Sequence, residues 1–334
     1  MASLPHTTPD GVPFLRPDDG DFQDLPDYAF APRYLDFEGL RLHYIDEGPR
    51  DGPVALLMHG MPTWSFLNRH IVRTLVAAGW RCIAADHIGF GKSDKVTDPD
   101  WYSIRRHTQA HRALVEALDL QGVTLFAQDW GGPIGLAQAA EMPARFSRLV
   151  VMNTWLHNSD FDYSTGVRQW HAGWQDGGLF DTHIGGNLSF GWFILVSFGL
   201  IPARAIYSMV QQGEHPTLDA ATDAIRRGYD APHAGQGRDI YAGPRRFPLS
   251  IPIDQPQAET AQTQARHYAA LLGWQKPIHF IWGGKDDVFT EGWGRQWAAN
   301  YPQATFDLLP DAGHFPQETH GVEIAHRVLA YCAG

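Results

Sequence analysis

Short runs of apolar residues, many of them β-branched, recur along the chain, and the stretches between them return to apolar residues every three or four positions. Continuous apolar runs of this length are typical of strands buried on both faces, as in a parallel sheet. We expect strands at residues 54–58, 82–85, 123–127, 149–152, 278–282 and 305–309. The helical periodicity predicts helices at residues 65–78, 104–118, 131–140, 291–300 and 322–332. This alternation predicts an α/β fold with a mostly parallel central sheet flanked by helices.

Two segments depart from that alternation. Residues 34–37 and 40–45 alternate between polar and apolar positions around Glu38-Gly39, which predicts an antiparallel hairpin at the edge of the sheet. From about residue 156 to residue 228, helical and loop patterns rich in Trp, Phe and Gly replace the strand signals. We therefore expect a core domain of residues 1–155 and 229–334 and an inserted helical cap of residues 156–228. Such a cap would close the cleft in which open α/β sheets bind ligands.

Charge and composition narrow the choice of partners. The 334 residues include 26 basic and 37 acidic ones, giving a formal charge of −11, so we expect no binding to nucleic acid or to an anionic membrane, whose negative charges would repel this surface. The apolar run at residues 192–201 has about half of the roughly 20 residues that a membrane-spanning helix needs, so we expect a buried helix. The N-terminal stretch lacks the pattern of a signal peptide, and only Cys82 and Cys332 are present, which favours a cytoplasmic location.

Three motifs that suggest a metal or a nucleotide fail on inspection. The run Gly89–Ser93 resembles the end of a Walker A loop, but Asp86 stands where the first glycine is needed. His107 and His111 have a metal-compatible spacing without a third ligand, so we expect two solvated histidines. The acidic cluster Asp18–Asp21 lacks the spacing of a calcium loop and predicts a solvated turn. We expect no metal and no cofactor.

The most informative segment is residues 123–135, a predicted strand followed by Gln128-Asp129-Trp130-Gly131-Gly132 and then a helix. This is the layout of a nucleophile elbow, with Asp129 where a hydrolase usually has serine. The helix N-terminus would stabilise the carboxylate, because peptide dipoles and free N–H groups favour negative charge there. The alternative is that Asp129 is only the N-cap of that helix.

Residues at three other predicted strand ends would complete a catalytic site. His59-Gly60-Met61-Pro62 follows the first long strand, and Met61 would supply an oxyanion-hole N–H together with that of Trp130, although Gly-x-Pro is also an ordinary strand-to-helix turn. Asp286 and His314 follow the last two strands, so the order nucleophile, acid, base is that of α/β-hydrolases. Asp287 is the second choice for the acid, since the earlier strand ends in the neutral Asn153.

An aspartate nucleophile restricts the chemistry. Attack on an ester or amide would give an anhydride, whereas attack on a saturated carbon that bears a leaving group gives an ordinary ester. His314 would then activate water to hydrolyse the ester of Asp129, with Asp286 orienting the imidazole. Alkyl halides and epoxides both fit this route.

The indole N–H of Trp130, a donor in an apolar ring, suits a weakly hydrated halide. Epoxide opening would instead need a proton, and four tyrosines in or near the cap keep that alternative open: Tyr163, Tyr207, Tyr229 and Tyr241. A further alternative, from a different class, is a non-catalytic ligand-binding receptor on the same scaffold.

Taken together, these motifs resemble those of haloalkane dehalogenases, most closely the subfamily with two halide-binding tryptophans and the acid after the later strand. The resemblance rests on residues 34–36, 43–48, 59–65, 89–95, 128–132 and 311–315. It implies an α/β-hydrolase fold and a hydrolase that acts on carbon–halide bonds, with a halogenated substrate and water as reactants, halide as a product, and a monomeric or small homo-oligomeric state.

By the same resemblance, Trp130 is the first halide donor and a cap tryptophan is the second. Trp192 matches best by position, with Trp155, Trp170 and Trp174 as rivals. Met61 departs from the family pattern, in which Glu or Asn often stands at this position, so the polar side chain is lost while the N–H remains.

Overall fold

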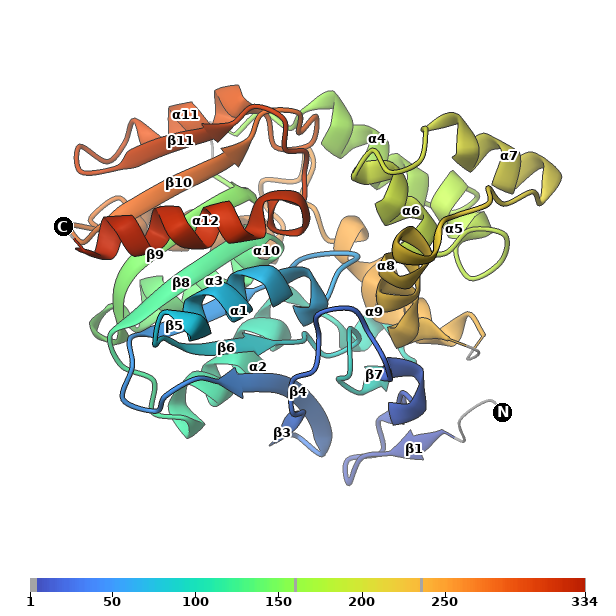
Figure 1. Ribbon diagram of the computed structural model, residues 1–334, viewed down its shortest axis with the longest axis horizontal. Coiled ribbons are helices and arrows are strands. Elements are labelled where there is room, and N and C mark those ends of the chain that lie inside the picture. The colour runs from blue at the N-terminus through green and yellow to red at the C-terminus, as the bar shows by residue number, and fades with distance from the viewer. Residues whose placement is uncertain (1–4, 159–160, 235–236, 334) are drawn as a thin grey trace.

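A central sheet of eight strands organises the computed structural model, which describes residues 5–158, 161–234 and 237–333 (Figure 1). Its strand order across the sheet is β11 (Thr305–Leu309), β10 (Ile278–Gly283), β9 (Phe146–Thr154), β8 (Val123–Asp129), β5 (Val54–Met58), β6 (Arg81–Ala85), β4 (Leu40–Glu47) and β3 (Arg33–Phe37). Neighbours from β11 to β6 pair in parallel, and β4 and β3 add an antiparallel edge. The predicted fold class and edge hairpin are therefore confirmed.

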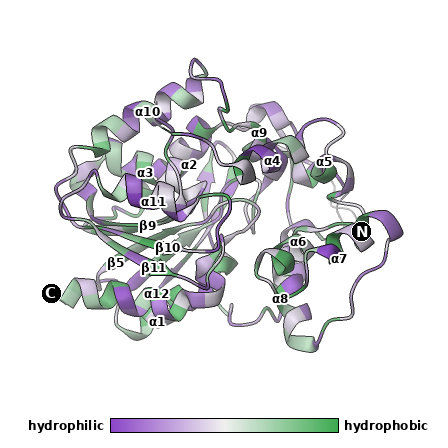
Figure 2. Cartoon of the chain, turned by 90° about the horizontal axis from the view of Figure 1, so that it is seen from above, coloured by the Kyte–Doolittle hydropathy of each residue, from purple (hydrophilic) through white to green (hydrophobic). Residues whose placement is uncertain are grey.

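Helices cover both faces of this sheet, as Figure 2 shows. One face carries α1 (Arg69–Ala77) and α12 (Pro316–Ala333), and the other carries α2 (Ile104–Ala117), α3 (Gly131–Glu141), α10 (Glu259–Leu271) and α11 (Glu291–Ala298). Side-chain caps fix where helices begin: Ser103 accepts from the N–H of Arg106 at the start of α2, and Thr290 accepts from that of Trp293 at the start of α11. With helices on both faces, every residue of β8 is buried, which explains its continuous apolar run.

The strand predictions hold closely. β5 and β11 have the predicted bounds, while β6, β8, β9 and β10 extend one to three residues further at an end. Helix α10 was not predicted, because its buried positions include Ala261 and Gln264 rather than a clear apolar stripe. A small second sheet was also missed, formed by strands of two or three residues: β1 (His6–Thr7), β2 (Pro13–Leu15) and β7 (Lys95–Val96).

A group of helices lies beyond the carboxyl ends of the parallel strands (Figure 1). It consists of α4 (Thr165–Trp174), α5 (Leu179–His183), α6 (Phe190–Ser197), α7 (Arg204–Gln212), α8 (Ala220–Asp230) and α9 (Ala242–Leu249). The expected cap boundary at residue 228 falls inside α8, and helical structure continues beyond it. Short 3-10 helices complete the described elements: η1 (Asp19–Phe22), η2 (Ser65–Asn68), η3 (Pro99–Trp101), η4 (Pro143–Arg145), η5 (Ala231–His233) and η6 (Asp239–Tyr241).

The end of α8 is bonded to the core. The indole N–H of Trp64 donates to the carbonyl of Gly228 at 2.9 Å, and the hydroxyl of Tyr229 donates to a carboxylate oxygen of Glu318 at 2.5 Å. The same carboxylate accepts from Arg69, so one buried acid joins α1, α12 and α8. The helix in which the expected boundary falls is therefore tied to the core at its end.

One sequence expectation fails in α2. His107 and His111 are both buried, with 1% of each residue exposed, because they share a helix face with Leu114, which packs in the core. Residues four and then three positions apart occupy one side of a helix. The described residues hold no group of His, Cys, Asp and Glu that could bind a metal ion, and none of their helices is long and apolar enough to span a membrane.

Candidate active site

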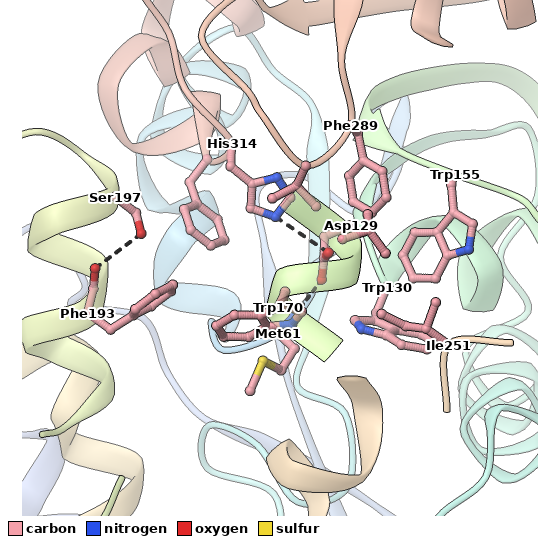
Figure 3. A pocket seen from close by; sticks show the side chains of 13 residues that line it. Met61, Asp129, Trp130, Trp155, Trp170, Phe193, Ser197, Ile251, Phe289 and His314 are labelled. Carbon is pink, nitrogen blue, oxygen red and sulfur yellow. Dashed lines mark hydrogen bonds and ion pairs between the residues drawn. The ribbon is translucent and has the colours of Figure 1, made fainter. Parts of the chain in front are cut away.

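Loops at the carboxyl ends of four parallel strands bring the predicted catalytic residues together, and Figure 3 shows Met61, Asp129 and His314 among them. Met61 follows β5, Asp129 ends β8, Asp286 follows β10 and His314 follows β11. All but His314 are buried, and His314 has a side chain only 15% exposed. The site therefore forms where the order of the strands places their ends side by side.

Asp129 stands in a sharp turn between β8 and α3. Its φ of 49° lies in the left-handed region, which is costly for a residue with a side chain. The hydroxyl of Thr154 donates to the carbonyl of Asp129 at 2.5 Å and helps to hold this turn. A Cβ atom at Gly60 would overlap the Asp129 carboxylate, so only glycine allows the opposite loop to approach so closely.

The two carboxylate oxygens of Asp129 have different surroundings. Oδ1 accepts a hydrogen bond from the backbone N–H of Met61 at 2.7 Å, as the oxyanion-hole interpretation requires. Oδ2 faces Nε2 of His314 at 3.5 Å. The N–H of Trp130 makes no hydrogen bond to the carboxylate within the part of the chain that the structure describes. One oxygen is thus engaged by a backbone donor, and the other faces the imidazole.

His314 lies between two carboxylates. Its Nδ1 is 2.9 Å from Oδ2 of Asp286, and its Nε2 faces Asp129. Burial alone would lower the pKa of His314, but the charges of Asp286 and Asp129 outweigh it and raise this pKa from 6.5 to about 10. The imidazole is therefore protonated at neutral pH.

Asp286 is held by donors on both of its oxygens. Oδ1 accepts from the backbone N–H groups of Val288 and Phe289 at 2.7 and 3.1 Å, and Oδ2 accepts from the side-chain amide of Asn153 at 2.9 Å as well as facing His314. Asp287 is exposed and makes no contact with His314 in the described structure. Of the two acids that the sequence left open, the geometry brings Asp286 to the imidazole.

Two residues with positioning contacts were not identified from the sequence. Asn153, considered there only as a failed acid, fixes Asp286 and accepts from the N–H of Gly283 at 2.7 Å. Gln128 donates from its side chain to the carbonyl of His314 at 2.9 Å. Gln128 immediately precedes Asp129, and Asn153 immediately follows the strand predicted at residues 149–152. A polar side chain at a buried strand end was the available signal.

An apolar cavity of about 80 Å³ opens above the Asp129 carboxylate. Core and cap both contribute to its wall, which is formed by Met61, Asp129, Trp130, Trp155, Val167, Trp170, Phe193, Ser197, Ile251, Val288, Phe289, His314 and Phe315 (Figure 3). Cavities of this kind exclude water and strengthen the electrostatic interactions within them.

Three indoles line the cavity, but they differ in where the N–H group lies. The Nε1 atom of Trp155 is buried and inaccessible from the cavity. The rings of Trp130 and Trp170 line the cavity, and neither indole N–H donates a hydrogen bond to another described residue. Trp130 comes from the elbow and Trp170 from α4 of the cap, so the cavity is flanked by one available indole donor from each region.

The structure contradicts the placement of Trp192. Its ring packs against His215 at 5.1 Å and beneath the guanidinium of Arg226 at 5.1 Å, and it is absent from the cavity wall. Trp192 lies on α6, whose inner positions Phe190 and Ile194 are buried while Trp192 is only partly so. The sequence context was misleading because α6 is apolar on all sides, so periodicity does not reveal its inner face.

The four candidate tyrosine acids also lie elsewhere. Tyr163 bonds to His157 at 2.8 Å, Tyr229 bonds to Glu318, Tyr241 stacks on His233 and Tyr207 is 66% exposed. None of the four contributes to the cavity wall. An epoxide-derived alkoxide in this cavity would therefore find no tyrosine proton donor among the residues that line it.

The chain is similar in sequence to a known family model and to several named proteins. The family model described as alpha/beta hydrolase fold matches residues 53–181. The chain is 34% identical to a haloalkane dehalogenase of Psychrobacter cryohalolentis and 36% identical to one of Mycolicibacterium paratuberculosis, in each case over 95% of this chain and 97% of the relative. It is also 30% identical to a cis-3-alkyl-4-alkyloxetan-2-one decarboxylase of Xanthomonas campestris, over 88% of this chain and 93% of the relative.

The chain is also similar to a solved structure of a haloalkane dehalogenase. The tetrameric haloalkane dehalogenase DpaA from Paraglaciecola agarilytica superposes with a TM-score of 0.80 at 31% identity, covering 95% of this chain and 98% of that one. The similarity extends over the helical region as well as the sheet.

Proposed function

Because this chain belongs to the haloalkane dehalogenase family, we propose that it hydrolyses the carbon–halogen bond of small haloalkanes and that Asp129 is its nucleophile. The observation that carries the assignment is the pair of environments around the Asp129 carboxylate. Oδ1 is held by the N–H of Met61, and Oδ2 faces the apolar cavity and His314. Attack by Oδ2 on the halogen-bearing carbon forms an alkyl ester and releases halide, while Oδ1 becomes the ester carbonyl oxygen.

The departing halide needs donors that tolerate an apolar surrounding. The unbonded indole N–H groups of Trp130 and Trp170, whose rings line the cavity, are the available donors, so we assign the second halide contact to Trp170 in place of Trp192. Because Met61 brings no polar side chain to the wall, no side-chain amide or carboxyl from this position adds to the halide contact of the two indoles.

Formation of the ester also prepares His314 for the second step. The negative charge of Asp129 is one of the causes of the raised pKa of His314, and alkylation removes that charge. The pKa then falls, and the imidazole can accept a proton from water, which attacks the ester carbonyl carbon. Asp286 orients the ring and stabilises its positive charge, and the Met61 N–H stabilises the oxyanion on Oδ1.

The size of the cavity indicates short substrates. A protein cavity of about 150 Å³ accommodates benzene, so the cavity of about 80 Å³ in this protein fits a chain of a few carbons. The oxetanone substrate named for the Xanthomonas relative carries two alkyl chains on a ring and is larger than this space. We therefore expect turnover of short bromoalkanes and none of that decarboxylation.

A trapping experiment tests the assignment. His314→Gln should react with 1-bromopropane, release bromide once, and keep a propyl group on Asp129, because attack does not need the histidine but hydrolysis does. Intact mass and peptide mapping measure the adduct, and the exposed His326→Gln serves as a matched control that should turn over as the wild type does. A non-catalytic receptor would form no adduct. Turnover of epoxides without bromide release from any bromoalkane would assign the alternative activity instead.

We further infer that the protein works in the cytoplasm as a monomer or small homo-oligomer. Its cysteines, Cys82 and Cys332, are free thiols, which suits a reducing compartment. The tetramer described for the Paraglaciecola relative shows that the fold accommodates assembly. Light scattering of the purified protein measures its own state.

A further inference from the structure

Three buried histidines outside the candidate triad form a connected chain that ends at the oxyanion turn. His59 precedes Gly60 in this turn, His87 lies in the loop after β6, and His111 lies on α2. Each is essentially inaccessible to solvent, at 0%, 0% and 1% exposed. We name these three residues the histidine relay.

The hydrogen bonds of the relay fix which nitrogen carries each proton. The backbone N–H of His87 donates to Nε2 of His59 at 3.0 Å, so the proton of a neutral His59 is on Nδ1, which donates to the carbonyl of Gly60 at 2.8 Å. Nε2 of His87 lies 2.8 Å from the carbonyl of His59, which can only accept, so Nε2 carries the proton and Nδ1 of a neutral His87 is bare. Nε2 of His111 then donates to it at 2.6 Å.

This pattern is that of neutral rings, and the surroundings of all three favour the neutral form. Burial lowers the pKa values of His59 and His87, and it lowers that of His111 to about 3. The relay therefore acts as a set of dipoles with fixed direction, not as a store of positive charge.

The relay acts on the peptide group that supplies the oxyanion donor. The carbonyl of Gly60 and the N–H of Met61 belong to one planar peptide group and point in opposite directions. That carbonyl accepts from Nδ1 of His59 at 2.8 Å and from the hydroxyl and N–H of Thr63 at 3.0 and 3.1 Å. Holding the carbonyl on one side fixes the N–H on the other side, aimed at Oδ1 of Asp129.

A carbonyl that accepts strongly makes the N–H of the same peptide a better donor. Only the imidazole of His59 bonds to the Gly60 carbonyl. His87 holds His59 at two points, through its backbone N–H to the His59 imidazole and through its ring to the His59 carbonyl, and His111 holds the ring of His87. We propose that the histidine relay orients the Met61 N–H, with His87 and His111 fixing His59, so that His59, His87 and His111 are positioning residues for the hydrolysis of the alkyl ester.

This proposal, which rests on the proposed function, makes opposite demands on the two half-reactions. In the free site the Met61 N–H stabilises the charged carboxylate, and that charge decreases as Oδ2 attacks carbon. In ester hydrolysis, negative charge develops on Oδ1, where the same N–H points. A weaker donor therefore slows hydrolysis but leaves alkylation unchanged or faster. Loss of general structural integrity would slow both steps.

Matched variants at two neighbouring buried histidines provide the test. His87→Phe keeps an aromatic ring but removes the side-chain donor to the backbone carbonyl of His59. His87→Gln keeps a side-chain N–H that can reach this carbonyl. His107→Phe is the control, since His107 is equally buried and its ring lies 5.6 Å from that of His87, but its nitrogens have no hydrogen-bond partner. Alkylation and hydrolysis rate constants are measured separately by rapid-quench single turnovers with 1-bromopropane.

We expect His87→Phe to slow hydrolysis about tenfold, less than the roughly 100-fold cost of removing an oxyanion donor outright, without slowing alkylation. His87→Gln should recover most of the loss, and His107→Phe should change neither constant by more than about twofold. Equal losses in both half-reactions, or equal behaviour of His87→Phe and His107→Phe, would overturn the proposal. If the wild type forms no alkyl ester at all, the proposed function fails instead.

A second measurement remains available if His87→Phe does not fold. His111→Phe leaves the bond between His87 and the His59 carbonyl in place and removes only the outermost donor. In the His314→Gln background, the carbonyl stretch of the trapped ester reports the hydrogen bond to Oδ1 directly. The relay predicts a higher stretching frequency when His111→Phe is added, and an unchanged frequency would contradict it.

Discussion

Core and cap contribute to the same cavity by different physical means. The core supplies Met61, Asp129, Asp286 and His314 from strand ends, and hydrogen bonds join them to one another. The cap supplies Val167, Trp170, Phe193 and Ser197 from helices, and the hydroxyl of Ser197 bonds within its own helix at 3.1 Å to Phe193. The positions of the catalytic residues are thus fixed by directional bonds on a rigid sheet. The fit of the substrate depends on the packing of apolar cap side chains, and packing tolerates substitution more readily than such bonds do.

The largest expected effect comes from removing the nucleophile. Asp129→Ala should lower bromide release from 1-bromopropane by about 10⁴-fold or more, since no other cavity residue can form the ester. A bromide assay measures the loss, and the variant's melting temperature checks that the fold persists. Residual turnover within tenfold of the wild type would show that the core does not hold the nucleophile assigned to it.

The next effect separates the two neighbouring acids. Asp286→Asn should slow ester hydrolysis by roughly 10³- to 10⁴-fold, as for other triad acids, while bromide is still released in a single burst. The pKa of His314 should also fall, because the charge of Asp286 is the first of the causes that raise it. Asp287→Asn, at an exposed position, is the control and should behave as the wild type.

A smaller effect is expected in the cap. Trp170→Phe keeps the aromatic ring and removes the indole N–H, so it should weaken bromide binding and alkylation by about tenfold or more, the value of one hydrogen bond to a charged group. Trp192→Phe should change neither by more than about twofold, because this ring lies against Arg226 and His215. Bromide quenching of tryptophan fluorescence and steady-state kinetics measure both. A larger loss in Trp192→Phe than in Trp170→Phe would show that Trp192, and not Trp170, contacts the halide.

The smallest effect is on stability. The pKa of His314 is raised from 6.5 to about 10 in the folded protein, so the stabilisation from its protonated form is complete below pH 6.5 and is lost as the pH rises to about 10. The difference in melting temperature between wild type and His314→Gln should therefore shrink across this interval. A constant difference from pH 6.5 to pH 10 would show that the imidazole is not paired with the two carboxylates.

The same contrast explains what could be predicted from sequence. In the core, each strand buried on both faces appears in the sequence as a continuous apolar run. Asp129, Asp286 and His314 each come at the end of such a run, so they could be predicted to lie at the same edge of a parallel sheet. The positioning role of Asn153 was missed because a neutral side chain reveals its use only through its partner, here Asp286.

In the cap, neither the helices nor their contacts follow from periodicity. Trp170 and Trp192 are both aromatic residues in helical stretches, and only tertiary packing decides which indole reaches the cavity. The buried His107 and His111 were misjudged for a related reason, since histidine carries no apolar signal even where it occupies the inner face of a helix.

The left-handed backbone of Asp129 has a consequence for how the protein could change. A glycine at this position would relieve a conformational cost of order 1 kcal/mol, so a sequence selected only for durability would discard the side chain that the reaction needs. The unfavourable backbone of the turn is held in place by the surrounding sheet and by the hydrogen bond from Thr154. The missing side chain of Gly60 leaves room for the Asp129 carboxylate. Engineering for heat resistance should therefore leave this turn untouched and seek its gains elsewhere in the molecule.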